Sequence, residues 1–164
     1  MARTIDNLMK MMSSNSVSSI RYLAFAEASD EAGHHGVAKV FRAIARAKRV
    51  HALSHFRATR EVDTTSENLK LAFEEETYDY KNAYPPMVQD AVTDDALEAR
   101  HSLEYGMSIG PVITRLINKA MSHLDGDSEG SYFVCPLCGN IEFGNPPDKC
   151  PFCGVDAKQF EVVS

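Results

Sequence analysis

The residues with the clearest chemical potential are four cysteines, which fall in two pairs near the C-terminal end of the chain. They are Cys135, Cys138, Cys150 and Cys153. Each pair belongs to a CPxCG unit, and eleven residues lie between the two inner cysteines. Two tight turns at this spacing can surround one metal ion with four thiolates, and Gly139 and Gly154 supply the backbone freedom that the turns need. The pattern therefore predicts a tetrahedral metal site and not a set of disulfides.

The identity of the metal ion is open from the spacing alone. Zinc and iron both accept four thiolates in a tetrahedron. Only iron would make the site a centre for electron transfer. Zinc would serve to fold the tail, because about 35 residues cannot build a sufficient core without such a staple. Both hypotheses stand at this point.

Apolar residues recur at intervals of three and four before the cysteines, as they do in amphipathic helices. The predicted helices span residues 6–32, 35–60, 66–88 and 93–123. Asp6 is the predicted N-cap of the first helix and Gly33 its predicted end, and the polar run at 64–66 supplies the cap of the third. Pro85 and Pro86 predict a kink or break in the third helix. Four helices with short connections favour an antiparallel-type bundle.

The helical pattern ends before the cysteine pairs. Residues 125–131 read DGDSEGS, which is typical of a polar, flexible linker, and Gly, Pro and Cys dominate beyond it. We therefore expect a mainly α chain with two domains. A helical bundle is predicted over residues 1–124, and a small metal-binding domain over residues 132–164.

The charge of the chain limits its partners. A formal net charge of -6 and a pI near 5.5 argue against nucleic acid, which favours a basic face. No apolar run approaches the roughly 20 residues that a bilayer-spanning helix needs, so we expect no membrane association. The N-terminal MARTIDNLMKMM lacks the features of a signal peptide, and we expect a cytoplasmic location.

Several segments of the chain resemble the rubrerythrin family. PPDKCPFCG and the closing QFEVV are similar to its rubredoxin-like domain, and RYLAFAE, FRAIARAKRVHA and NLKLAFEEETYDYKNAYP are similar to its first three helices. The resemblance covers essentially the whole chain. It implies a ferritin-like four-helix bundle, usually dimeric, joined to a rubredoxin-like iron domain that passes electrons to a di-iron centre reducing hydrogen peroxide. It also favours iron over zinc at the cysteines.

The resemblance further implies where bundle ligands should stand: a Glu on the first helix, ExxH on the second, ExxE on the third and ExxH on the fourth. At these positions the chain has Asn15, then Lys48 and His51, then Glu76 and Asp79, then Gly110 and Ile113. In the family, bridging carboxylates neutralise the four positive charges of two ferrous ions. In this chain most of the family's ligands are missing, and the ammonium group of Lys48 replaces one carboxylate. We therefore predict a lost or much altered bundle site, in which Lys48 pairs directly with Glu76 or Asp79. Pro111 adds a disturbance in the fourth helix.

An alternative ligand pair exists on the fourth helix. His101 and Glu104 form an HxxE pattern, and they would be the ligands if the fourth helix were aligned with the family pattern in a different register. Both lie opposite the apolar stripe through Leu103, Met107 and Gly110, so a solvent-facing position is favoured.

Three functions compete. The leading hypothesis is a divergent rubrerythrin-like protein, expected as a homodimer, that transfers single electrons through one iron at the cysteines to a redox partner protein or a dimer mate, without a di-iron centre. The second is a non-haem iron peroxidase with altered bundle ligands. The third is a structural or assembly subunit with zinc at the cysteines.

Overall fold

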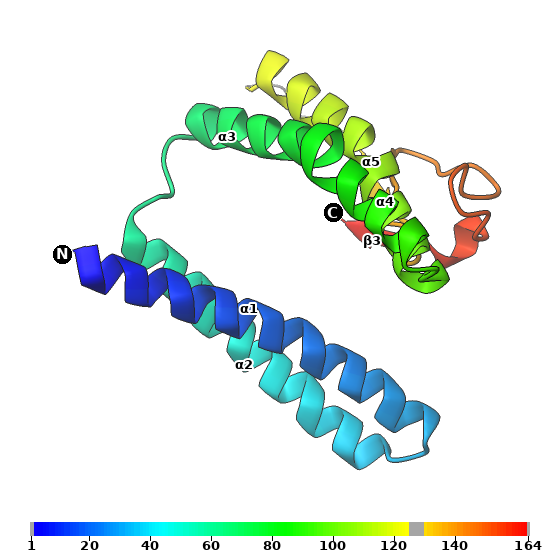
Figure 1. Ribbon diagram of the computed structural model, residues 1–164, viewed down its shortest axis with the longest axis horizontal. Helices are drawn as coiled ribbons and strands as arrows, with labels where there is room; N and C mark the ends of the chain where they lie inside the picture. The colour runs from blue at the N-terminus through cyan, green and yellow to red at the C-terminus, as the bar shows by residue number, and fades with distance from the viewer. Residues whose placement is uncertain (1, 125–129, 164) are drawn as a thin grey trace. The chain divides into compact units, whose positions relative to one another are not determined.

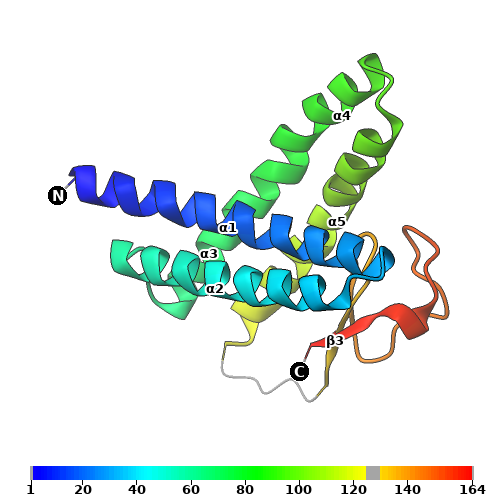
Figure 2. The ribbon, with the colours of Figure 1, turned by 90° about the horizontal axis from the view of Figure 1, so that it is seen from below.

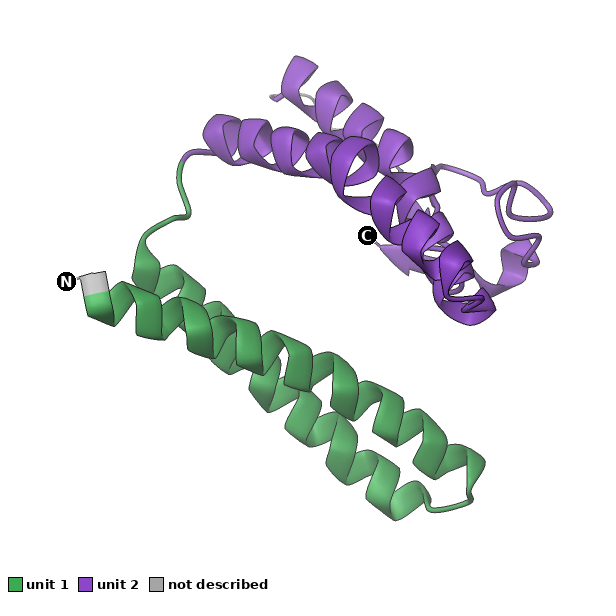
Figure 3. Ribbon diagram, in the orientation of Figure 1, with its two compact units in different colours: residues 1–63 green, residues 64–164 purple. Residues whose placement is uncertain are grey.

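Helices occupy most of the chain in the computed structural model, which describes residues 2–124 and 130–163 (Figure 1). They are α1 (Ala2–Glu31), α2 (His35–Thr59), α3 (Thr65–Tyr78), the π-helix η1 (Asp79–Ala83), α4 (Tyr84–Thr93) and α5 (Leu97–Ser122). None of the helices in the described ranges is long and apolar enough to cross a membrane. The chain divides into two compact units, residues 1–63 and residues 64–164 (Figure 3). The predicted domain boundary at residue 125 stays a prediction, and residues 125–129 of the predicted linker lie outside the described ranges.

The first unit is a hairpin of α1 and α2, which lie side by side in both views (Figures 1 and 2). Gly33 has φ +77 and closes the turn between them, as predicted. Small buried side chains at seven-residue intervals, Ala38, Ala45 and Ala52, line the inner face of α2. Because such side chains are short, the helices approach closely enough for Ser19 Oγ of α1 to donate to the Ala45 carbonyl oxygen at 3.0 Å. The predicted cap at Asp6 is wrong, since α1 begins at Ala2.

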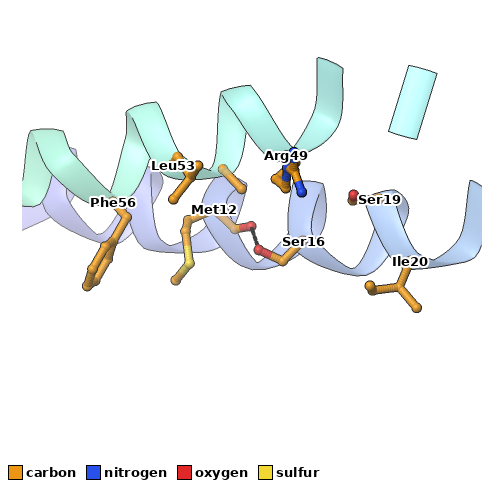
Figure 4. A pocket seen from close by; sticks show the side chains of 8 residues that line it. Met12, Ser16, Ser19, Ile20, Arg49, Leu53 and Phe56 are labelled. Atoms are coloured by element: carbon orange, nitrogen blue, oxygen red, sulfur yellow. Dashed lines mark hydrogen bonds between the residues drawn. The ribbon is translucent and has the colours of Figure 1, made fainter. Parts of the chain in front are cut away.

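A two-helix hairpin has too little interior for all of its apolar side chains. Large side chains such as Ile20, Val40 and Leu53 are exposed within the described part of the chain. Ile20 and Leu53 also line an open pocket of about 280 Å³ together with Phe56 and Arg49 (Figure 4). An apolar face of this kind is a surface suited to packing by further helices.

The second unit begins with a capped helix. Thr64 Oγ1 accepts a hydrogen bond from the Glu67 amide at 3.3 Å, which confirms a cap in the predicted polar run. The expected interruption at Pro85 and Pro86 takes the form of one π-turn, η1, which ends two residues before Pro85. Proline lacks an amide hydrogen, and a change of hydrogen-bond pattern accommodates the loss. As a result α3, η1 and α4 follow one another along a single path, and α5 returns beside them (Figure 2).

The small β domain is a three-stranded antiparallel sheet of β1 (Tyr132–Val134), β2 (Ile141–Phe143) and β3 (Glu161–Val163), in the order β2-β1-β3. The central residue Phe133 pairs with Glu142 of β2 on one side and Val162 of β3 on the other. A short 3-10 helix, η2 (Ala157–Gln159), precedes β3. The chain is thus mainly helical with a small C-terminal sheet, as expected from the sequence.

Candidate metal centre

The first CPxCG unit folds into a tight turn that starts at the end of β1. The Cys135 amide donates to the Asn140 carbonyl oxygen at 2.8 Å, and the Gly139 amide donates to the Cys135 carbonyl oxygen at 3.0 Å. Gly139 has φ +75, a backbone conformation that favours glycine. This conformation aims the following amides at the sulfurs: the Leu137 and Cys138 amides donate to the Cys135 thiol, and the Asn140 amide donates to the Cys138 thiol.

The second unit repeats this geometry fifteen residues later in the sequence. The Cys150 amide donates to the Val155 carbonyl oxygen at 2.7 Å, and the Gly154 amide donates to the Cys150 carbonyl oxygen at 2.9 Å. Gly154 has φ +77, and the Val155 amide donates to the Cys153 thiol. The two turns are therefore equivalent in their backbone bonding, as the repeated motif predicted.

The two turns bring the four sulfurs together. Cys135 Sγ lies 3.4 Å from Cys153 Sγ, Cys138 Sγ lies 3.5 Å from Cys150 Sγ, and all four sulfurs lie within 4.8 Å of one another. A tetrahedron with metal to sulfur distances of about 2.3 Å needs sulfurs roughly 3.8 Å apart. The four thiolates, which we call the cysteine cage, therefore fit one tetrahedral zinc or iron ion.

The surroundings of the cage favour the binding of a cation. Burial raises the pKa of the Cys138 and Cys153 thiols, although the amides of Asn140 and Val155 act in the opposite direction. Burial acts to raise the pKa of Cys135, but the Cys138 and Leu137 amides, together with hydrogen bonds from the Cys153 and Cys138 thiols, lower it to about 7. Buried thiolates of like charge are stable together only when a metal ion supplies the compensating positive charge.

The cage packs against the helical part of its own unit. Ile109 and Val112 of α5 are buried in one apolar cluster with three of the cysteines and with Phe160, which precedes β3. Cys153 alone among the four is half-buried, so the cage has three covered sulfurs and one nearer to solvent. Leu137 and Phe152, which stand inside the two turns, are exposed beside it.

Two of the predicted bundle positions in the first unit, Asn15 and Lys48, form a hydrogen-bonded pair of one neutral and one cationic side chain. Asn15 is 3% exposed, and its Oδ1 accepts a hydrogen bond from Lys48 Nζ at 3.1 Å. His51, three residues after Lys48, is exposed. The ammonium group of Lys48 thus occupies the neighbourhood in which the family resemblance implies carboxylates.

The predicted bundle positions in the second unit lie around one cavity of about 250 Å³. Its lining includes Glu76, Asp79, Gly110 and Ile113, and also Cys138 of the cage. Burial raises the pKa of Glu76, and the negative charges of Asp79 and Glu75 raise it further. The structure therefore brings these four positions together. The predicted pairing of Lys48 with Glu76 or Asp79 would be between residues of different units, and it stays a prediction.

Two glycine contacts beside this cavity were missed by sequence reasoning. A Cβ atom placed on Gly110 would lie 2.7 Å from Tyr80 Cγ and closer still to Tyr80 Cβ, and one on Gly106 would lie 2.6 Å from Tyr84 Cζ. No side chain fits in either place without movement of a helix or a ring. The available signal was a pair of glycines four residues apart on one helix and a pair of tyrosines four residues apart on another.

The alternative ligand pair on α5 does not point into a site. His101 is exposed, and Glu104 Oε1 accepts from Arg100 Nε at 2.7 Å in a partly exposed ion pair. A metal ion can be shared by three or more His, Cys, Asp or Glu side chains only where their ligand atoms lie close together. Among the described residues, the cysteine cage is the one group that meets this condition.

Comparisons with known proteins agree with this geometry. The family model described as "Rubrerythrin" matches residues 6–107, and the model described as "Rubrerythrin, rubredoxin-like domain" matches residues 133–161. Rubrerythrin-2 of Clostridium acetobutylicum is 24% identical and the match covers 98% of this chain and 97% of the relative. Nigerythrin of Nitratidesulfovibrio vulgaris is 24% identical over 92% of this chain and 81% of its own length.

Solved structures of nigerythrin share the fold. The mixed-valence state has a TM-score of 0.59 at 24% identity, and the fully reduced, all-ferrous state has a TM-score of 0.60 at 23% identity. Each comparison covers 98% of this chain and 86% of the nigerythrin chain. With one family model spanning most of the helices and another spanning the cage, the chain belongs to the rubrerythrin family and carries its four-cysteine rubredoxin-like site.

Proposed function

We propose that this chain is an electron-transfer member of the rubrerythrin family whose working centre is a single iron ion in the cysteine cage. Iron held by four thiolates carries one electron between its ferric and ferrous forms. In this proposal the bundle has lost its di-iron site, and the protein is not a competent peroxidase. A homodimeric state, a redox partner protein and a cytoplasmic location stay predictions.

The residues of the cage are suited to this role. Three of the sulfurs are covered by α5 and the sheet, which limits water at the metal and favours ligand retention. The amides aimed at the sulfurs stabilise the net negative charge of the site. Cys153 is the least buried of the four cysteines, and the exposed Leu137 and Phe152 in the two turns offer an apolar surface for a partner.

The observation that carries the loss of the bundle site is the contact between Gly110 and Tyr80. The family pattern puts a glutamate ligand at position 110, yet even a Cβ atom there would press on Tyr80. Because Tyr80 Cβ itself is in contact, the obstacle is the close approach of two helices and not only the position of a ring. A carboxylate could stand there only after the helices had moved apart.

Electrostatics support the same proposal. The amide of Asn15 and the ammonium of Lys48 stand where the family pattern has carboxylates, and they bond to each other. An ammonium group opposes the binding of two divalent ions, since like charges repel in a weakly screened interior. Glu76 and Asp79 remain as two carboxylates, too few to neutralise such a centre.

One observation favours the peroxidase as a second candidate. Glu76 and Asp79 line the same cavity as Cys138, so a metal ion bound between these carboxylates would lie near the cage. That candidate requires further ligands from residues that the family pattern does not identify.

Metal analysis separates the candidates. Protein purified from its native host is expected to contain one iron per chain, because the cage is the one complete ligand set among the described residues. About three irons per chain, measured by plasma mass spectrometry, would contradict the proposal and support the peroxidase. Colourless protein containing zinc would contradict it in favour of a structural or assembly subunit.

The loss of peroxidase activity is predicted to depend on several positions at once. Lys48→Glu restores one carboxylate, but Asn15, Gly110 and Ile113 are unchanged, so we expect no recovery of peroxide reduction. The measurement is peroxide consumption by the iron-loaded variant with a chemical reductant, compared with Lys48→Gln, which removes the charge without adding a carboxylate. Substantial activity in Lys48→Glu alone would show that the positions were assigned in the wrong register.

The two glycine contacts predict different responses to a second substitution. Gly106→Ala and Gly110→Ala are each expected to lower the free energy of unfolding by about 1–3 kcal/mol through overpacking. Tyr84→Ala removes the ring atoms that meet position 106, so Gly106→Ala should cost little in that background. Tyr80→Ala keeps the Cβ atom that meets position 110, so Gly110→Ala should remain costly.

Urea unfolding of the metal-loaded chain measures these effects. Gly36→Ala is the matched control, because a Cβ atom there meets nothing within 4 Å, and it should not destabilise the protein. Equal rescue of both glycine variants by their tyrosine partners would contradict a close backbone approach at Gly110.

A further inference from the structure

Asn140 is a buried polar residue at the edge of the cysteine cage. Its side chain is 1% exposed, and it is one of the largest fully buried side chains in the described part of the chain. It stands two residues after Cys138 and directly before β2. Burial of an amide side chain is costly unless it is hydrogen-bonded, so its partners indicate its role.

Asn140 makes three polar contacts, all at the cage or next to it. Its carbonyl oxygen accepts from the Cys135 amide at 2.8 Å, and its amide donates to the Cys138 thiol. Its side-chain Nδ2 donates to Glu142 Oε1 at 2.9 Å. One residue therefore connects the Cys135 backbone and the Cys138 sulfur with a carboxylate.

Glu142 is held in place by this bond. It lies in β2, is half-buried, and pairs with Phe133 in the sheet. Among the described residues it forms no salt bridge with Lys, Arg or His. No cation within salt-bridge distance in the described part of the chain offsets its negative charge, and partial burial reduces its screening by water.

We propose that Asn140 is a positioning residue that holds the Glu142 carboxylate beside the cage, and that this fixed charge lowers the reduction potential of the iron site. The redox part of the inference rests on the proposed function. Four thiolates give the ferric site a net charge of about -1 and the ferrous site about -2, since one electron from the electrode or partner enters without a proton. A nearby carboxylate opposes that added negative charge.

Glu142→Gln tests the charge without disturbing the bond. Glutamine keeps an oxygen that accepts from Asn140 Nδ2, but it is neutral. We expect the reduction equilibrium to shift toward the ferrous form by about tenfold, which is 59 mV for a one-electron couple. Glu161→Gln is the matched control, because Glu161 is also in the sheet but is exposed, and its variant should shift the equilibrium less than about twofold.

Asn140→Ala tests the positioning. It frees Glu142 to turn into solvent, so the equilibrium should shift in the same direction, and adding Glu142→Gln should then change it little further. The measurement is the midpoint potential by electrochemistry, with the visible spectrum of the cobalt-substituted protein as a check that the tetrahedral geometry is kept. Independent, additive shifts would reduce Asn140 to a purely structural residue and overturn the proposal, as would an unchanged potential in Glu142→Gln.

Zinc binding separates this inference from the proposed function. Zinc binding releases the protons of the thiols to solvent, so it changes the net charge of the cage from near zero to about -2. Glu142→Gln should therefore tighten zinc binding severalfold in competition with a chelator, while Glu161→Gln should not. Native protein that contains zinc would end the electron-transfer proposal, but the zinc competition would still support or overturn the role of Asn140 and Glu142.

Discussion

The packing of α5 constrains the whole second unit, because one stretch of this helix packs both against the cysteine cage and against η1 and α4. Ile109 and Val112 fill the apolar cluster around the cysteine cage. Gly106 and Gly110, on adjacent turns, let the tyrosines of η1 and α4 approach the helix backbone. A larger residue at either glycine would push away the helices that line the cavity, and a smaller one at Ile109 or Val112 would uncover the sulfurs. The cage and the altered bundle positions are thus coupled mechanically through α5.

The parts of the structure that follow from local rules could be predicted from the sequence. The two cysteine turns require only adjacent residues, and both turns formed with the glycine conformations that the motif implies. Helix ends at Gly33 and near Thr64 also follow from short-range bonding. Asp6 failed as a cap because the helical pattern continues through the preceding residues, where a polar side chain is equally compatible with a helix interior.

The features that depend on distant residues could not be predicted in the same way. The Gly110 contact joins residues thirty positions apart in the sequence, and periodicity alone does not pair one glycine with one tyrosine. The π-turn arises where two prolines meet a helix that other contacts keep continuous, so local rules indicated an interruption but not its form. The bond between Lys48 and Asn15 required knowledge of how α1 faces α2. The sequence predicted which positions differ from the family pattern, while the contacts of those residues depended on packing.

The different fates proposed for the two metal sites follow from where their ligands stand. The cage draws its ligands from residues 135–153, so two turns stapled by backbone bonds can hold it even if the helices change. The bundle site needs ligands spread over residues 15–113, and each is useful only while the others are in place. A Cβ atom at position 110 would press on Tyr80, and burial together with the negative charges of Asp79 and Glu75 raises the pKa of Glu76. A raised pKa means that a proton competes more strongly with a metal ion for Glu76, so in the proposed loss of the bundle site one missing ligand weakens the next.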